Sequence, residues 1–345
     1  MKTKPMTKFA ILALSLVLVA CAGGGSEEAG CPAIDGREIN VVATTPMIGE
    51  FVSQVGGENI NLTVLMPPEA NPHTYEPAPQ DAGTIAEADL VFYTGLLYEP
   101  AALVKLLENS ACSTDILSEV GESVFPIEFK EGGHDDHDDH DDHDDHDDEE
   151  GHDDHDDEEG HDDHEGHNHG AYDPHFWFDP SRVAYAAEYI ESRLIQFDPE
   201  NESSYKSSAD SFVSELNDLT KQVSELISTV PSQNRKLITT HESLGYLEAK
   251  FGLEVLSTII PSLNSANEIS PSDLAGVIDV IEDNNVKVIF IESEAPSVYS
   301  ETIVAETGIK PVTGLYVETL KPGQSYSEFL ISNVKLITEN LQDTD

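Results

Sequence analysis

Cysteine and basic residues are both scarce in this chain. Three cysteines in 345 residues are too few for a zinc site built from thiolates or for a disulfide-rich scaffold. Only 17 lysines and arginines stand against 67 aspartates and glutamates, which gives a formal net charge of −50 at pH 7. Because proteins that bind nucleic acid need positive charge to neutralise phosphates, this balance excludes nucleic acid as a partner.

Long hydrophobic runs are also lacking. The main apolar stretch, residues 9–20, is shorter than the roughly 20 residues that a membrane-spanning helix needs. It follows lysines at positions 2, 4 and 8, and this arrangement predicts a signal peptide over residues 1–20. The sequence therefore predicts an exported protein that does not span a membrane.

The apolar stretch ends in Leu18-Val19-Ala20-Cys21, which resembles the bacterial lipoprotein box. In lipoproteins the signal peptidase cuts before this cysteine, which then carries lipid. The resemblance implies a lipidated Cys21, followed by a tether over residues 21–37 whose glycine-rich start predicts flexibility. We therefore expect an extracytoplasmic protein anchored to a membrane by its N-terminus. The other two cysteines, Cys31 and Cys112, could form one disulfide in an oxidising compartment, and the sequence leaves this open.

Histidine is concentrated in one segment, residues 131–170. This segment holds eleven of the fourteen histidines and 22 acidic residues, with no lysine or arginine, and repeats His-Asp-Asp from His134 onward. Such a repeat has almost no apolar residues and cannot bury a core, so it predicts a disordered loop. Imidazole and carboxylate are ligands for divalent metals, and we expect the loop to hold several ions loosely. A merely solubilising acidic linker would explain the aspartates but not the histidines.

Outside this segment, short apolar strands alternate with helices in two series. The alternation predicts an α/β fold with two βα lobes and parallel-type sheets, over residues 38–197 and 231–345. Between them, residues 198–230 predict one long rigid helix, because apolar residues recur at alternating spacings of four and three. A coiled-coil dimer is the competing interpretation, but the helix faces lack strong opposite-charge pairing, and we expect a monomer. The apolar face consists of Tyr205, Ala209, Phe212, Leu216, Leu219, Val223, Leu226 and Val230.

The three remaining histidines, His73, His175 and His241, lie at predicted strand ends or in loops beside the lobes. Glu292 follows a predicted strand over residues 286–291 in the same manner. Ligands of open α/β sheets bind at the carboxyl ends of the strands. One such histidine alone is usually a core residue, but three imidazoles and one carboxylate can close a tetrahedral zinc site. The sequence therefore predicts a metal site in the cleft between the lobes.

Four segments carry a family resemblance. Residues 71–77, 173–180, 240–247 and 290–292 resemble motifs of the metal-binding solute receptors of ABC importers, of the zinc/manganese type. The resemblance covers essentially the mature chain in order and includes a His-rich loop between the first two motifs. It implies two βα lobes joined by a rigid backbone helix, with one metal ion in the cleft. It also implies a receptor without enzymatic activity, which delivers metal to a membrane permease and its ATPase.

The resemblance also implies a ligand set. His73, His175 and His241 match the histidine ligands of the family, and histidine at the third position is typical of zinc receptors. The prediction is therefore one tightly bound Zn²⁺, which imidazole also favours over manganese. Manganese-type members carry an aspartate a few residues beyond the 290–292 motif, where this chain has none. Glu292 is predicted as the fourth ligand, with Glu294 or water as alternatives.

Two more acidic residues and the pH response complete the predictions for the site. Glu76 and Asp179 could orient ligating imidazoles, or could only cap helices and turns. Because metal binding requires neutral imidazole, retention of the metal should fall as the pH drops through the histidine range near 6.5.

Three other functions remain open from the sequence. A zinc-dependent hydrolase would also use three histidines, but the chain has no His-Glu-x-x-His motif, and a four-ligand site leaves no room for activated water. A surface metal store or adhesin would use the His-rich loop alone and would not need the cleft. A receptor for manganese or another divalent metal would differ only in its cargo.

Overall fold

The computed structural model describes residues 31, 34, 36–129, 172–265, 267–294 and 298–342, and the described residues from Cys31 onward belong to one compact unit. The predicted signal peptide, the predicted lipidation site Cys21 and the His-rich segment 131–170 lie outside these residues. None of the described helices combines the length and the apolar character needed to cross a membrane.

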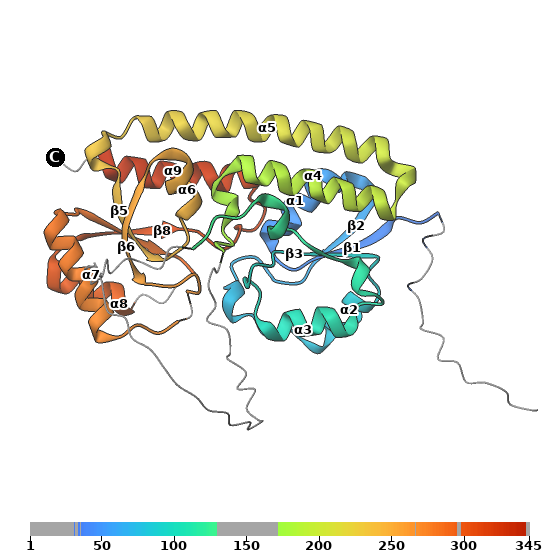
Figure 1. Ribbon diagram of the computed structural model, residues 1–345, viewed down its shortest axis with the longest axis horizontal. Helices are drawn as coiled ribbons and strands as arrows, with labels where there is room; N and C mark the ends of the chain where they lie inside the picture. Colours follow the sequence, from blue (N-terminus) through green and yellow to red (C-terminus); the bar gives the residue numbers. More distant parts are fainter. Residues whose placement is uncertain are drawn as a thin grey trace, which may run out of the picture. The chain divides into compact units, whose positions relative to one another are not determined.

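The first lobe is built on a sheet of four parallel strands in the order β2-β1-β3-β4 (Figure 1). Helices α1 and α4 cover one face of this sheet, while α2 and α3 cover the other. The strands are β1 (Ile39–Ala43), β2 (Ile60–Val64), β3 (Leu90–Tyr93) and β4 (Leu117–Glu119). The helices are α1 (Pro46–Gly56), α2 (Pro79–Ala86), α3 (Ala101–Ser110) and α4 (Pro180–Phe197).

The second lobe repeats this arrangement with a parallel sheet in the order β6-β5-β7-β8. The predicted α/β fold with two parallel sheets is therefore confirmed. The strands are β5 (Lys236–His241), β6 (Glu254–Ile260), β7 (Val288–Glu292) and β8 (Lys310–Leu315). The helices are α6 (Gly245–Phe251), α7 (Pro271–Asn284), α8 (Val298–Thr307) and α9 (Tyr326–Gln342).

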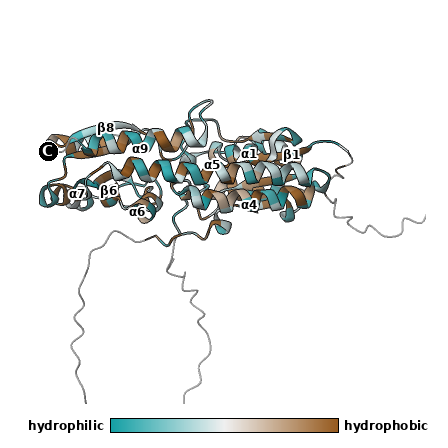
Figure 2. Ribbon diagram, turned by 90° about the horizontal axis from the view of Figure 1, so that it is seen from above, coloured by the Kyte–Doolittle hydropathy of each residue, from teal (hydrophilic) through white to brown (hydrophobic). Residues whose placement is uncertain are grey.

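Helix α5 (Glu202–Ser228) joins the two lobes and measures roughly 40 Å at 1.5 Å per residue. It packs against α1 and α4 of the first lobe and against α6 and α9 of the second. Hydrophobic and hydrophilic residues are interleaved along it (Figure 2), as one buried face requires. The buried face follows the predicted spacing until the last turn, where Ile227 is buried and Leu226 only partly so. An α-helix has about 3.6 residues per turn, whereas a 4-3 spacing repeats about every 3.5 residues. The buried face therefore drifts around the helix, which explains this shift at its end.

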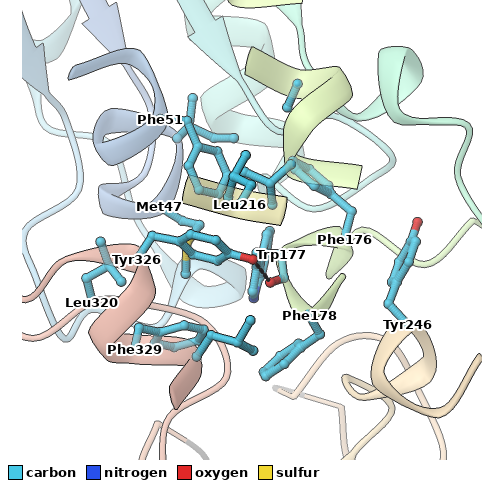
Figure 3. Close-up of a cluster of buried hydrophobic side chains, with 14 of the residues drawn as sticks. Met47, Phe51, Phe176, Trp177, Phe178, Leu216, Tyr246, Leu320, Tyr326 and Phe329 are labelled. Atoms are coloured by element: carbon cyan, nitrogen blue, oxygen red, sulfur yellow. Dashed lines mark hydrogen bonds between the residues drawn. The ribbon is translucent and has the colours of Figure 1, made fainter. Parts of the chain in front are cut away.

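The lobes also share one continuous hydrophobic core, which extends from Ile39 to Leu341. Aromatic residues from both lobes meet within it (Figure 3). The Tyr326 hydroxyl at the start of α9 donates to the carbonyl oxygen of Trp177 (2.6 Å), and the Trp177 indole donates to that of Val317 (2.8 Å). Burying one large aromatic side chain contributes about 1.5–3 kcal/mol, so this cluster holds the lobes together in addition to α5.

A disulfide joins Cys31 to Cys112, with their Cα atoms 5.1 Å apart. It ties the segment that precedes β1 to the residues just after α3. The sequence left this pairing open, and the structure contains it.

The strands β4 and β8, which both lie at sheet edges, lack the apolar runs from which strands are predicted. Strand β4 has only three residues, and β8 contains Pro311 and Gly314, two residue types that are rare in strands. Proline is tolerated at an edge because its missing N–H is not needed there. Strand β8 matters for the candidate site because the chain that follows it enters the space between the lobes.

Candidate metal centre

His73 lies in a short 3₁₀ turn, Pro72–Thr74, that follows β2. The Asn71 side chain starts this turn by accepting a hydrogen bond from the His73 backbone N–H (2.9 Å). Its amide also donates to Ser265 Oγ of the second lobe (3.0 Å). Pro72 disfavours a helical conformation at Asn71 and so fixes the entry to the turn. The imidazole is thus positioned by contacts to both lobes.

His175 precedes the buried turn Phe176–Phe178, which leads into α4. Asp173 Oδ1 accepts hydrogen bonds from both the backbone N–H and Nδ1 of His175, each at 2.8 Å. With Nδ1 engaged in this way, Nε2 is free to face the space between the lobes. Asp179, which was predicted as a possible partner of an imidazole, caps α4 by accepting from Ser181 N (2.9 Å). Glu76 is exposed.

His241 is the last residue of β5, and Glu292 is the last residue of the neighbouring strand β7. Glu292 Oε2 contacts Nδ1 of His241 at 2.5 Å, while Oε1 accepts from the His241 backbone N–H at 3.2 Å. Ser243 Oγ donates to the same Oε1 (3.2 Å). The predicted fourth ligand therefore holds the outer side of the His241 ring and leaves Nε2 facing inward.

The fourth member of the site is Glu318, three residues beyond β8. Its Oε1 lies 3.0 Å from Nε2 of His73 and 2.8 Å from Nε2 of His241, and its Oε2 lies 3.4 Å from Nε2 of His175. Ligand atoms of these four residues all lie within 4.8 Å of one another, and all four residues are buried. The three predicted histidines thus come together, with Glu318 where the sequence predicted Glu292.

The donor atoms fit a bound metal ion. Nε2 of His175 and of His241 are buried, and although Glu318 oxygens lie 3.4 and 2.8 Å from them, neither nitrogen makes a well-directed hydrogen bond within the described part of the chain. Buried polar atoms almost always have a partner, so two such atoms facing one carboxylate indicate a ligand between them. Zinc–ligand distances of about 2.0–2.1 Å place tetrahedral ligand atoms roughly 3.3 Å apart. Oε1 of Glu318 lies 3.0 Å from Nε2 of His73 and 2.8 Å from Nε2 of His241, close to this spacing.

Carboxylates control the protonation of the metal-free site. Burial alone would lower the pKa of His175, but Glu318 and Asp173 outweigh it and raise that pKa to about 9. The pKa of His241 is likewise raised well above its usual value, against burial, by Glu292 and Glu318. The three imidazoles in turn hold the pKa of Glu318 well below its usual value, although burial opposes this. Protons therefore occupy the site near neutral pH and compete with a metal cation.

Glu294, the predicted alternative to Glu292, contacts the backbone of Glu318. Its Oε1 accepts from the Glu318 N–H (3.3 Å), so it supports the loop that carries Glu318. Burial, together with the charges of Glu318 and Glu292, raises the pKa of Glu294 to about 8. Glu294 lies outside the group of four ligand atoms.

Tyr98, which the sequence did not single out, completes the surroundings of Glu318. Its hydroxyl lies 2.9 Å from Glu318 Oε2 and 3.1 Å from the Glu318 carbonyl oxygen. The ring packs edge to face against His73 and His175, with centroids 5.0 and 5.9 Å away. Burial, then the charge of Glu318, raises the pKa of Tyr98 well above its usual value, so the phenol keeps its proton.

The chain matches a known protein family over most of its length. The model of the family ZnuA, described as the periplasmic component A of a zinc-uptake complex, matches residues 41–340. The manganese ABC transporter substrate-binding lipoprotein PsaA of Streptococcus anginosus is 25% identical over 347 residues, which cover 98% of this chain and 99% of PsaA.

Two solved structures share the fold. The periplasmic zinc-binding protein TroA from Treponema pallidum gives a TM-score of 0.72 at 20% identity, covering 88% of this chain and 99% of TroA. Fe(III)-bound YtgA from Chlamydia trachomatis gives 0.71 at 24% identity, covering 88% of this chain and 98% of YtgA. The names of PsaA, TroA and YtgA refer to three different metals.

Proposed function

Since the chain belongs to the ZnuA family of periplasmic metal-uptake components, we propose that it captures Zn²⁺ between its lobes and delivers it to an ABC-type importer. Proteins of this family are substrate-binding receptors of metal transporters and not enzymes, which confirms the prediction of a non-enzymatic receptor. The family is also extracytoplasmic, as the sequence predicted. The finer parts of the proposal are the metal, its ligands and the route of delivery.

The observation that carries the proposal is the donor set. Three buried imidazole nitrogens from His73, His175 and His241 face the one carboxylate of Glu318. Three nitrogens and one oxygen in a compact group suit zinc, which favours four ligands in a tetrahedron. Manganese favours oxygen donors, and only one ligating residue here supplies them. The donor set therefore supports zinc, although PsaA is named for manganese.

Metal competition tests this choice. Protein purified without added metal and then titrated should bind one Zn²⁺ tightly, and an excess of Mn²⁺ should not displace it, because imidazole binds zinc more strongly. Elemental analysis and calorimetric competition with Mn²⁺, Ni²⁺ and Cd²⁺ are the measurements. Displacement of Zn²⁺ by equimolar Mn²⁺ would replace the zinc proposal with a manganese receptor.

Capture and delivery involve parts of the chain beyond the centre. The His-rich segment 131–170 lies between Glu128 and Tyr172, which form an isolated antiparallel bridge just ahead of His175. Ions held loosely by that segment would raise the local metal concentration beside the site. We propose that lipid on Cys21 anchors a monomeric receptor to the membrane. A permease and its ATPase then receive the metal.

Deleting residues 133–170 separates the two kinds of binding. We expect the deletion to reduce the total zinc bound to about one ion per chain without weakening the tight site, because none of the four ligands is removed. A variant with the eleven histidines of this segment replaced by asparagine keeps its acidity and is the matched control. Calorimetric titration measures both. Loss of the tight site on deletion would contradict the proposal that the His-rich segment binds ions loosely and the four-residue centre binds one ion tightly.

A further inference from the structure

We propose that Tyr98 determines the metal selectivity of the centre by holding one oxygen of Glu318 away from the metal, an inference that rests on the metal-binding function proposed above. The phenol acts as a positioning residue through the carboxylate. It makes Glu318 a ligand with a single oxygen and so favours four-coordinate zinc over manganese.

The two oxygens of Glu318 have different surroundings. Oε1 is the nearer neighbour of His73 Nε2 and His241 Nε2, at 3.0 and 2.8 Å. Oε2 lies 2.9 Å from the Tyr98 hydroxyl and 3.4 Å from His175 Nε2. A phenol has one proton to donate, and a carboxylate oxygen accepts it more strongly than a neutral carbonyl does. Tyr98 therefore occupies Oε2, while Oε1 is left for the metal.

This difference matters because zinc and manganese differ in the number of ligands they favour. Zinc in protein sites is most often tetrahedral, and one oxygen from Glu318 completes a set with three imidazoles. Hard cations such as manganese favour more ligands and more oxygens, which a carboxylate supplies when both of its oxygens bind. Occupying Oε2 withholds that additional oxygen. No other acidic residue in the described part of the chain belongs to the group of ligand atoms.

The loop before Tyr98 fixes the position of the phenol. Gly95, Leu96 and Leu97 are three successive residues with left-handed backbones, at φ values of 76°, 52° and 62°. Such conformations in leucine are unfavourable by roughly 1–2 kcal/mol each and persist only where neighbours enforce them. A Cβ at Gly95 would lie 2.0 Å from Glu119 Oε1, so this position also requires glycine.

Two carboxylates enforce that loop. Glu99 accepts hydrogen bonds from the backbone N–H groups of Thr94 (2.7 Å) and Gly95 (2.9 Å), and Glu119 accepts from that of Leu96 (2.9 Å). Glu99 is itself buried and accepts from the Thr44 hydroxyl (2.7 Å). The loop is therefore rigid on both sides of its left-handed residues, and the phenol is aimed at Glu318 before any metal binds.

Tyr98→Phe tests the proposal because it removes the hydroxyl and keeps the ring that packs on His73 and Trp177. We expect the ratio of zinc to manganese affinity to fall by about tenfold or more, as the loss of one hydrogen bond to a charged group allows. Cobalt-loaded protein gives a second readout. The strong visible absorption of four-coordinate Co²⁺ in the parent should weaken in the variant as the second oxygen binds.

Tyr205→Phe is the matched control, because the Tyr205 hydroxyl also donates from a buried position to a carboxylate, Asp198 (2.6 Å), but at the start of α5. It should leave the zinc-to-manganese ratio and the cobalt spectrum unchanged. An unchanged ratio and spectrum in folded Tyr98→Phe overturn the proposal. Tyr98→Leu, which also lacks the hydroxyl, gives the same test if Tyr98→Phe does not fold. Failure of the parent protein to bind zinc or cobalt would instead overturn the proposed function.

Discussion

Glu318→Gln weakens zinc binding by about a hundredfold to a thousandfold, since a structural zinc site of roughly 10–16 kcal/mol shares its free energy among four ligands. Glu292→Gln should weaken it by only about tenfold, at the low end of the effect of losing a residue that orients a ligand. A glutamine at position 292 can still accept a hydrogen bond from Nδ1 of His241, which the native carboxylate contacts at 2.5 Å. Calorimetric titration of the two variants with zinc measures both losses.

The two variants control for each other. Each removes one negative charge from a buried carboxylate near the same imidazoles, so the general electrostatic effect on a cation is similar. What differs is the contact, because Glu318 faces the three Nε2 atoms and Glu292 faces only the outer nitrogen of His241. A larger loss in Glu292→Gln than in Glu318→Gln would restore Glu292 as the ligand.

The contrast between these two glutamates shows how far the sequence determined the site. The strand-end rule identified Glu292 because residues 286–291 form a continuous apolar run. The same rule applied to β8 would have identified Glu318, but Pro311 and Gly314 conceal that strand. The rule also cannot tell which ring nitrogen faces inward. Glu292 is on the strand next to His241, and this proximity places it on the Nδ1 side.

The histidines were easier to predict, for a compositional reason. Only His73, His175 and His241 lie outside the His-rich segment, and each is in a short loop or at a strand end with its own motif. The lobes and the long helix could be predicted from the spacing of apolar residues, because burial of one face of a strand or helix sets that spacing within a short stretch of sequence. The contacts of Tyr98 could not be predicted in this way, because they depend on three left-handed residues whose conformation is enforced in part by Glu119, a carboxylate distant in sequence. Such tertiary constraints leave no local pattern.

The stability of the metal-free protein should fall as the pH rises from about 6.5 to 9. Burial opposes protonation of His175, but Glu318 and Asp173 raise its pKa to about 9, against about 6.5 in an unfolded chain. A raised pKa means that the proton stabilises the folded state fully below the unfolded value and no longer does so above the folded value. The loss is on the order of 3 kcal/mol for this residue. The raised pKa of His241 acts in the same direction.

Thermal unfolding across this pH range measures the effect, with zinc-loaded protein as the reference, because its ligating imidazoles are already neutral. Glu294 contributes with the same sign, because burial raises its pKa from about 4.3 in an unfolded chain to about 8, and stability falls as the pH rises between these two values. Glu294→Gln therefore isolates the contribution of the histidines. A metal-free protein that is equally stable at pH 6.5 and pH 9 would contradict the protonated site.

Proton release on zinc binding gives the same conclusion a second, independent test. The sequence predicted that protons compete with the metal near pH 6.5, the usual pKa of histidine. An imidazole with that pKa would release only about 0.1 proton when zinc binds at pH 7.5. With the pKa of His175 raised to about 9, that residue alone should release about one proton at pH 7.5, and His241 adds to it. Calorimetry in buffers of different ionisation enthalpy counts these protons. Because protons and zinc compete up to about pH 9, acidification around a docked receptor would favour release of the metal well above pH 6.5.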